Sequence, residues 1–125
     1  MKESQGLINP HRLRKIPRHY SWLDHRLIHE GYLRKISAEA SSLYLFLVCV
    51  GDQQGLSYYS DGAITKRLPI GDISTSRQEL IAVDLIAYNR PFYQVLSLPE
   101  KPEKRADNNR IGPPPEFYAF RESLK

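Results

Sequence analysis

Two histidines and one cysteine are the side chains best suited to catalytic or metal chemistry. His25 and His29 are four positions apart, so a helix would bring them to one face beside Asp24. A zinc site needs further ligands at defined spacing, and the sequence places no third ligand near this pair. Cys49 lies in an apolar stretch, which predicts a buried and unreactive thiol. We therefore expect no enzyme activity, no metal site and no cofactor.

A run of hydrogen-bonding side chains at positions 74–78 is the stronger chemical signal. Arginine pairs with O6 and N7 of guanine and glutamine pairs with adenine, each worth about 1–3 kcal/mol of discrimination. Hydroxyls and free N–H groups at a helix start suit phosphate oxygens. The alternative is that these residues only cap a helix and face solvent. The run consists of Ser74, Thr75, Ser76, Arg77 and Gln78.

Basic side chains outside this run are further candidates for contact with DNA phosphates. Residues 1–36 carry eight Lys or Arg against three Asp or Glu, whereas residues 37–98 carry four against six. The basicity therefore belongs to an N-terminal arm, which either follows a phosphate backbone or is simply solvated. Further candidates for DNA contact are Lys66, Arg67, Asn89 and Arg90, together with Arg12, Arg14 and Lys15 in the arm.

Length and composition limit the class of protein. The chain has 125 residues, 41% of them hydrophobic, which fits one soluble domain. Its longest unbroken apolar run, Leu43 to Val50, is far shorter than the ~20 residues of a membrane span. A single cysteine excludes an internal disulfide, and we expect no signal peptide. We expect a cytoplasmic protein without a membrane partner.

Proline content and charge divide the chain into three parts. Residues 1–20 are expected to form a basic arm, extended or irregular because of Pro10 and Pro17. Residues 21–98 are expected to fold. Residues 99–125 hold five of the nine prolines and are expected to be a flexible tail, whose aromatic end could bind a protein partner.

Capping residues predict four helices within the folded part. Ser21 is expected to cap a short helix to His29, ended by Gly31. Ser37 is expected to cap a long helix to Val50 that is apolar nearly all round and therefore central. Ser60 is expected to cap a helix over residues 61–68. The last helix is predicted over about residues 74–83, with two overlapping capping boxes, Thr75-x-x-Gln78 and Ser76-x-x-Glu79. The expected packing face of the first helix is Trp22, Leu23, Leu27 and Ile28.

Short aromatic segments predict the strands. Residues 56–59 read as a β-like segment, and residues 85–88 and 92–98 read as two strands joined by Asn89-Arg90-Pro91. Exposed aromatic rings among basic residues can stack single-stranded bases, but strand aromatics more often pack against a helix. We expect packing for this aromatic set, which is Tyr58, Tyr59, Tyr88, Phe92 and Tyr93.

Helix, short strand, helix, turn, helix and hairpin is the element order of a winged helix-turn-helix. Residues 37–47, 55–60 and 74–86 resemble the winged-helix modules of bacterial and plasmid replication initiators and transcriptional regulators. The resemblance implies a mainly α fold with a small β-hairpin wing, whose last helix enters the DNA major groove. One departure is Asp84, which stands where such proteins often have glycine.

The resemblance implies sequence-specific binding of double-stranded DNA, first as a transcriptional regulator. A replication or mobile-element protein is one alternative, and a protein-interaction module on the same fold is another. A homodimer is a further partner that the resemblance allows. DNA binding predicts a continuous positive face made by the last helix, the hairpin tip and the arm. A protein-interaction module instead predicts an exposed apolar patch, with Arg77 held in salt bridges.

Overall fold

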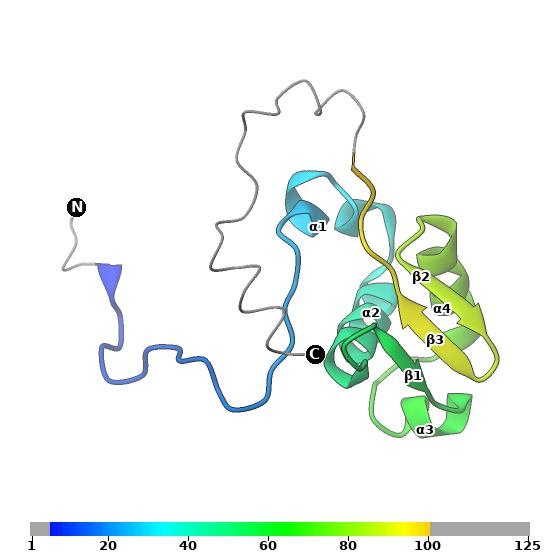
Figure 1. The fold of residues 1–125 in the computed structure, drawn as a ribbon, viewed down its shortest axis with the longest axis horizontal. Helices are drawn as coiled ribbons and strands as arrows, with labels where there is room; N and C mark the ends of the chain where they lie inside the picture. The colour runs from blue at the N-terminus through cyan, green and yellow to red at the C-terminus, as the bar shows by residue number, and fades with distance from the viewer. Residues whose placement is uncertain (1–5, 101–125) are drawn as a thin grey trace.

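The computed structural model describes residues 6–100. Within them the chain forms four α-helices and a small three-stranded antiparallel sheet (Figure 1). The prediction of a mainly α chain with a hairpin is therefore confirmed in part, because the hairpin belongs to a larger sheet. In chain order the elements are α1 (Arg26–His29), the 3-10 turn η2 (Leu33–Lys35), α2 (Ala38–Val50), β1 (Leu56–Tyr58), α3 (Asp61–Thr65), α4 (Ile73–Ala82), β2 (Ile86–Asn89) and β3 (Phe92–Val95).

The first helix is shorter than predicted. It begins after Asp24, whose Oδ1 accepts a hydrogen bond from the backbone N–H of Arg26 at 2.9 Å, so Ser21 is not its cap. Only Leu27 of the predicted packing face is buried, whereas Trp22, Leu23 and Ile28 are at least half exposed. One turn of helix presents too few positions to bury a whole apolar face. Residues 7–20 form no helix or strand, as predicted, and this arm extends away from the other elements (Figure 1). Residues 21–25, which were expected to belong to the helix, form none.

Helix α2 begins as predicted at Ser37, whose Oγ accepts the N–H of Ala40 at 3.1 Å. Its buried side chains are Ala40, Leu43, Tyr44 and Leu47, at the i, i+3, i+4 spacing of one helix face. The opposite face is open: Leu45 is 51% exposed and Cys49 is exposed. The expectations of a helix enclosed on all sides and of a buried Cys49 were therefore wrong, because elements cover only one side of α2.

Two further helices pack beside α2. Helix α3 is capped by Ser60, as predicted, but it ends at Thr65 and places Lys66, Arg67 and Leu68 in a turn. Helix α4 begins one residue before the predicted start. Its cap is Asp72, which accepts the N–H of Thr75 at 3.1 Å, so the two predicted capping boxes do not form. Glu79, assigned to one of those boxes, instead accepts the backbone N–H of Ser37 at 2.6 Å and ties α4 to the start of α2.

Strand order in the sheet is β1-β3-β2, with β1 and β2 each antiparallel to β3. Ser57, Tyr93 and Ile86 are buried on the inner face, against which α2 packs at β3 and α4 packs at β2. Gly55, at φ +82°, precedes β1, and its carbonyl oxygen accepts the backbone N–H of Val95 at 2.9 Å. A Cβ atom there would lie 2.7 Å from the carbonyl oxygen of Val95, so only glycine fits without a shift.

The core lies between α2, α4 and the inner face of this sheet. Leu43, Leu47, Ile64, Leu80 and Tyr93 are fully buried in it. Within residues 6–100, no helix has both the length and the apolar character that crossing a membrane requires. The aromatic end of the predicted tail lies outside the described residues, as does everything after Glu100.

Candidate nucleic-acid interface

Helix α4 divides the predicted contact residues into an exposed set and a buried set. Ser74, Thr75 and Gln78 face solvent. Ser76 and Arg77 are only 2% and 8% exposed, so these two are removed from the predicted contact surface. The reason is helical spacing. Arg77 lies four positions after Ile73 and three before Leu80, and both of these are in the core, so its Cα is on the inner side of the helix.

The Arg77 guanidinium joins four elements. Its Nη1 donates to Asp61 Oδ1 at 2.9 Å, in α3, and to Tyr93 Oη at 2.8 Å, in β3. Its Cζ lies 4.4 Å from the ring centroid of Tyr88, in β2. Burial acts to lower the pKa of Arg77, but the hydrogen bonds to Asp61 and Tyr93 outweigh it and raise that pKa. The Arg77 side chain is therefore charged, and its guanidinium is bound to residues within the fold.

An acidic side chain occupies the start of α4. The two carboxylate oxygens of Asp72 accept the backbone N–H of Thr75 at 3.1 Å and the Thr75 hydroxyl at 2.8 Å. Both bonds lower the pKa of Asp72, and the bond from the Thr75 hydroxyl has the larger effect. The carboxylate therefore stays ionised at neutral pH. A carboxylate here takes the place that a phosphate would occupy at a free helix start. The predicted phosphate contact by the hydroxyls at this helix start is therefore unfavourable.

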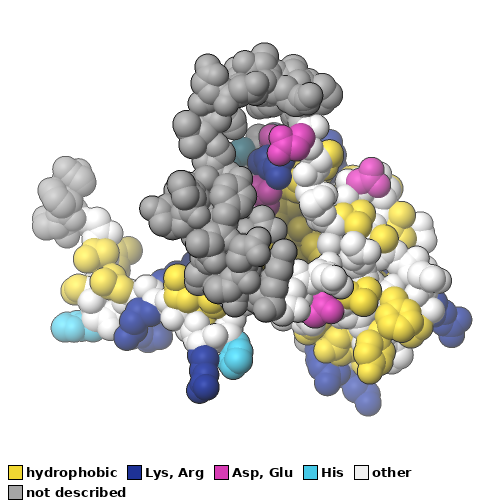
Figure 2. Space-filling view, in the orientation of Figure 1, with side chains coloured by type: hydrophobic (Ala, Val, Ile, Leu, Met, Phe, Trp, Pro, Cys, Tyr) yellow, Lys and Arg dark blue, Asp and Glu magenta, His cyan; other side chains and the backbone are white. Residues whose placement is uncertain are grey.

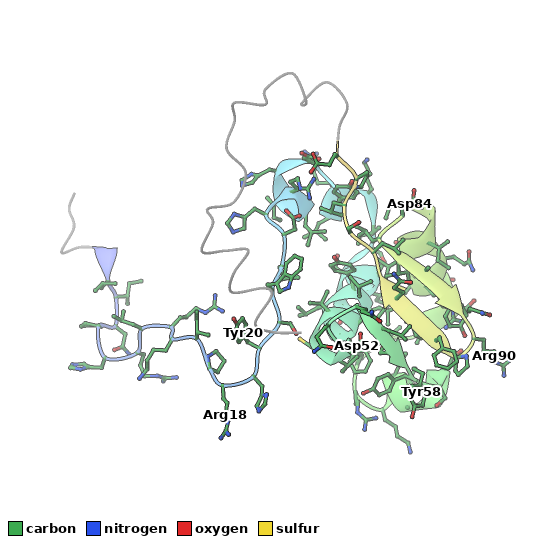
Figure 3. All side chains as sticks on the ribbon, in the orientation of Figure 1. Arg18, Tyr20, Asp52, Tyr58, Asp84 and Arg90 are labelled. Atoms are coloured by element: carbon green, nitrogen blue, oxygen red, sulfur yellow. The ribbon has the colours of Figure 1, made fainter. Side chains whose placement is uncertain are left out.

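Exposed cations lie at three places on the described folded part of the chain, and one of these is η2, with Arg34 and Lys35. Lys66 and Arg67 follow α3, and Arg67 Nη1 also donates to the carbonyl oxygen of Ala63 at 2.8 Å. Arg90 is exposed at the β2–β3 turn, next to the exposed Asn89 that ends β2. A groove separates this turn from the start of α3, and its lining includes Ser60, Tyr88 and Arg90. Arg90 lies at the tip of the hairpin and points away from the sheet (Figure 3).

The arm carries the largest group of exposed cations. Arg12, Arg14, Lys15 and Arg18 are all exposed. None of them forms an ion pair with an acidic residue in the described part of the chain. Dark-blue side chains follow the arm at a distance from those of the folded part (Figure 2). On the side seen in Figure 2 the positive charge of the described residues lies in separate groups, and the single continuous face expected for DNA binding is not seen there.

The aromatic set is divided between the core and the surface. Tyr93 is buried, and Tyr59 packs edge-on against Phe46 of α2 with ring centroids 5.1 Å apart, as expected. Tyr58 and Phe92 do not pack inward: they are 69% and 46% exposed, and their ring centroids lie 5.7 Å apart. Alternation along the strands would have revealed this, because neighbours in a strand point to opposite faces.

The histidine pair has no metal-binding partner in the described residues. The rings of His25 and His29 are near, with centroids 6.2 Å apart and planes almost perpendicular. Within residues 6–100, no group of three or more His, Cys, Asp or Glu side chains is arranged to hold a metal ion.

Comparison of the chain with protein-family models, with curated proteins and with solved structures finds no match.

Proposed function

We propose that this chain is a winged-helix protein that binds double-stranded DNA with sequence preference. The order α2-β1-α3-α4 followed by the β2–β3 hairpin, with β1 completing the sheet, is the order of that fold. In this assignment α3 and α4 form the helix-turn-helix, α4 is the recognition helix and the hairpin is the wing.

The observation that carries the proposal is the polar, uncharged solvent face of α4. Ser74, Thr75 and Gln78 lie within four positions of each other and are exposed, while Ile73 and Leu80 of the same helix are buried. Gln78 has the amide that can pair with adenine N6 and N7 in the major groove. Since Arg77 is held inside the fold, sequence preference on this helix depends on Gln78 and not on a guanine-reading arginine.

Backbone contact is assigned to cations outside α4. Lys66 and Arg67 lie in the turn that leads to α4, and Arg90 is at the wing tip. Because Asp72 repels phosphates at the start of α4, we assign the electrostatic attraction to these three and the arm. Neutralising phosphates releases counterions, so affinity should fall steeply as salt increases.

Fluorescence anisotropy with a labelled random duplex, at low and at high salt, tests the proposal. We expect salt-sensitive binding at micromolar protein, which is typical of non-specific DNA binding. Replacing Arg12, Arg14 and Lys15 by Ala should reduce the slope of log affinity against log salt by about 0.9 for each phosphate that the arm no longer neutralises. Absence of salt-sensitive binding to any duplex would refute the proposal.

A second variant separates preference for a DNA sequence from non-specific electrostatic attraction to DNA. Duplexes selected from a random library should prefer one sequence, and Gln78→Ala should weaken that preference by about 1–3 kcal/mol while leaving non-specific binding unchanged. Gln54→Ala is the matched control, because it removes an exposed amide outside α4 and should leave the preference unchanged. Transcriptional regulation is the first role that we propose for such binding, and replication or mobile-element maintenance is the alternative.

One observation favours a second candidate, a protein-interaction module. Arg77 is in a salt bridge with Asp61, and the exposed face of α4 carries no cation of its own. This candidate predicts that duplex DNA of any sequence fails to bind at low salt, whereas a protein partner is captured by the folded chain. The same anisotropy titration therefore distinguishes the two candidates.

A further inference from the structure

The outer face of the sheet is open and carries two neighbouring aromatic rings. It is turned away from α2 and α4, and in register it presents two rows: Tyr58, Phe92 and Asn89 in one, and Leu56, Gln94 and Ala87 in the other. All six side chains are exposed and none is charged. Figure 2 looks onto this side of the sheet, where yellow and white side chains lie together and dark-blue side chains border them. We propose that this outer face binds single-stranded nucleic acid by stacking bases on Tyr58 and Phe92.

The rings are placed as a stacking surface requires. Tyr58 of β1 and Phe92 of β3 are direct partners across the strand pair, with centroids 5.7 Å apart and planes inclined by 50°. Exposures of 69% and 46% leave ring surface free on each. Stacking needs an unpaired base, because the faces of paired bases are already covered in a duplex. The ligand class is therefore a single strand, which differs from the duplex assigned to α4.

Polar groups beside the rings match the rest of a nucleotide. Asn89 lies in the row of the two rings and Gln94 in the neighbouring row, and their amides can donate to and accept from base edges. Arg90 follows Asn89 at the same end of the sheet as Tyr58 (Figure 3). Its guanidinium is exposed and suited to a phosphate.

Two acidic side chains near this face already have partners within the fold. Asp61 pairs with Arg77. Asp52 Oδ1 accepts the N–H groups of Gln54 and Leu56, at 2.8 and 2.9 Å. Neutral rings and amides beside the exposed Arg90 complement a polyanion with exposed bases. An apolar protein surface would leave both amides without hydrogen-bond partners, which favours the nucleic acid as occupant.

Anisotropy with a fluorescein-labelled oligothymidine of about ten nucleotides tests the assignment, since single-strand sites cover about 4–16 nucleotides. Tyr58→Leu and Phe92→Leu should each weaken binding about tenfold or more, because stacking contributes about 1–3 kcal/mol per base. Tyr58→Phe keeps the ring and should bind within about twofold of the wild type. Binding to duplex should be unchanged by all three variants. Loss of single-strand binding with duplex binding intact therefore separates this site from α4.

Two results would refute the proposal that bases stack on Tyr58 and Phe92. Wild-type protein that fails to bind oligothymidine at low salt refutes it, and so do Leu variants that bind as well as the wild type. A dimer by light scattering that Tyr58→Leu converts to monomer would show that the face joins two copies of this chain. Thermal melting checks that each variant folds.

A direct readout does not depend on the variants. Oligonucleotide carrying 5-iodouracil, irradiated with wild-type protein, should crosslink to Tyr58 or Phe92. Crosslinks confined to α4 or to the arm would contradict the assignment.

Discussion

Replacing Arg77 by alanine should destabilise the fold more than it affects any ligand. The truncation removes a charged donor from Asp61 and from Tyr93, and a cation stacked on Tyr88. Asp61 is 52% exposed in its side chain, so its pair contributes only about 0.5 kcal/mol. The buried Tyr93 hydroxyl loses its bond to Arg77 at a cost of about 1–3 kcal/mol. The stacked cation adds about 0.5–1 kcal/mol.

The expected total is a loss of about 2–4 kcal/mol in the free energy of unfolding. Urea unfolding followed by circular dichroism, with linear extrapolation, measures it. Arg90→Ala is the matched control: an exposed arginine whose removal should change stability by less than about 0.5 kcal/mol. In a cycle with Tyr93→Phe, the two changes should couple by about 1 kcal/mol, since they remove the same hydrogen bond. Arg77→Lys keeps the charge and should lose less stability than Arg77→Ala.

A structural role for Arg77 is ruled out if Arg77→Ala unfolds at the same urea concentration as the wild type but loses preference for its DNA sequence. That result would mean that Arg77 leaves its buried partners and reaches a base. A loss of stability without coupling to Tyr93 would assign the effect to packing of the Arg77 side chain alone.

Two further predictions concern the ends of α4. Asp84 follows this helix at φ +62°, where its N–H donates to Ile81 O and the next N–H, that of Leu85, donates to Leu80 O. Asp84→Gly should relieve the left-handed conformation and stabilise the fold by about 0.5–1 kcal/mol, measured by urea unfolding. Asp84→Ala keeps a Cβ, so an equal gain there would contradict the explanation. At the other end, the folded pKa of Asp72 is lowered, so its contribution to stability is full above the unfolded pKa and is lost as pH falls through the folded pKa. Asp72→Asn should therefore flatten the acid side of the stability profile below about pH 4, and an unchanged profile would count against the cap.

Signals within a few residues allowed much of the fold to be predicted from the sequence. Ser37 and Ser60 were identified as caps because a cap depends only on the hydroxyl and on the N–H three residues later. The aromatic and β-branched runs located all three strands, although the strands end earlier or begin later than predicted. The departure at Asp84 was also visible, and the structure explains it as a left-handed residue in a position that glycine fills more easily.

The start of α4 shows where local signals compete. Asp72, Thr75 and Ser76 can each cap a helix, and the sequence favoured the last two. Tertiary packing favours Asp72 instead: Ile73 is in the core, which requires the helix to include it, and Glu79 is bonded to Ser37, which is 42 residues away. No local pattern contains that contact.

The candidate site depended most on tertiary structure. The sequence established which residue types are present: hydroxyls and an amide on one helix, cations in the arm and at the hairpin, and aromatic rings in the strands. Which of them are available to a ligand follows from the packing of the folded chain. Arg77 is withdrawn to the interior because Asp61 and Tyr93, each 16 positions away, meet it there. Tyr58 and Phe92 are exposed because strand register places them together on the face that no helix within residues 6–100 covers. Burial is a property of contacts between distant segments, and for that reason composition and spacing could name the candidates without selecting among them.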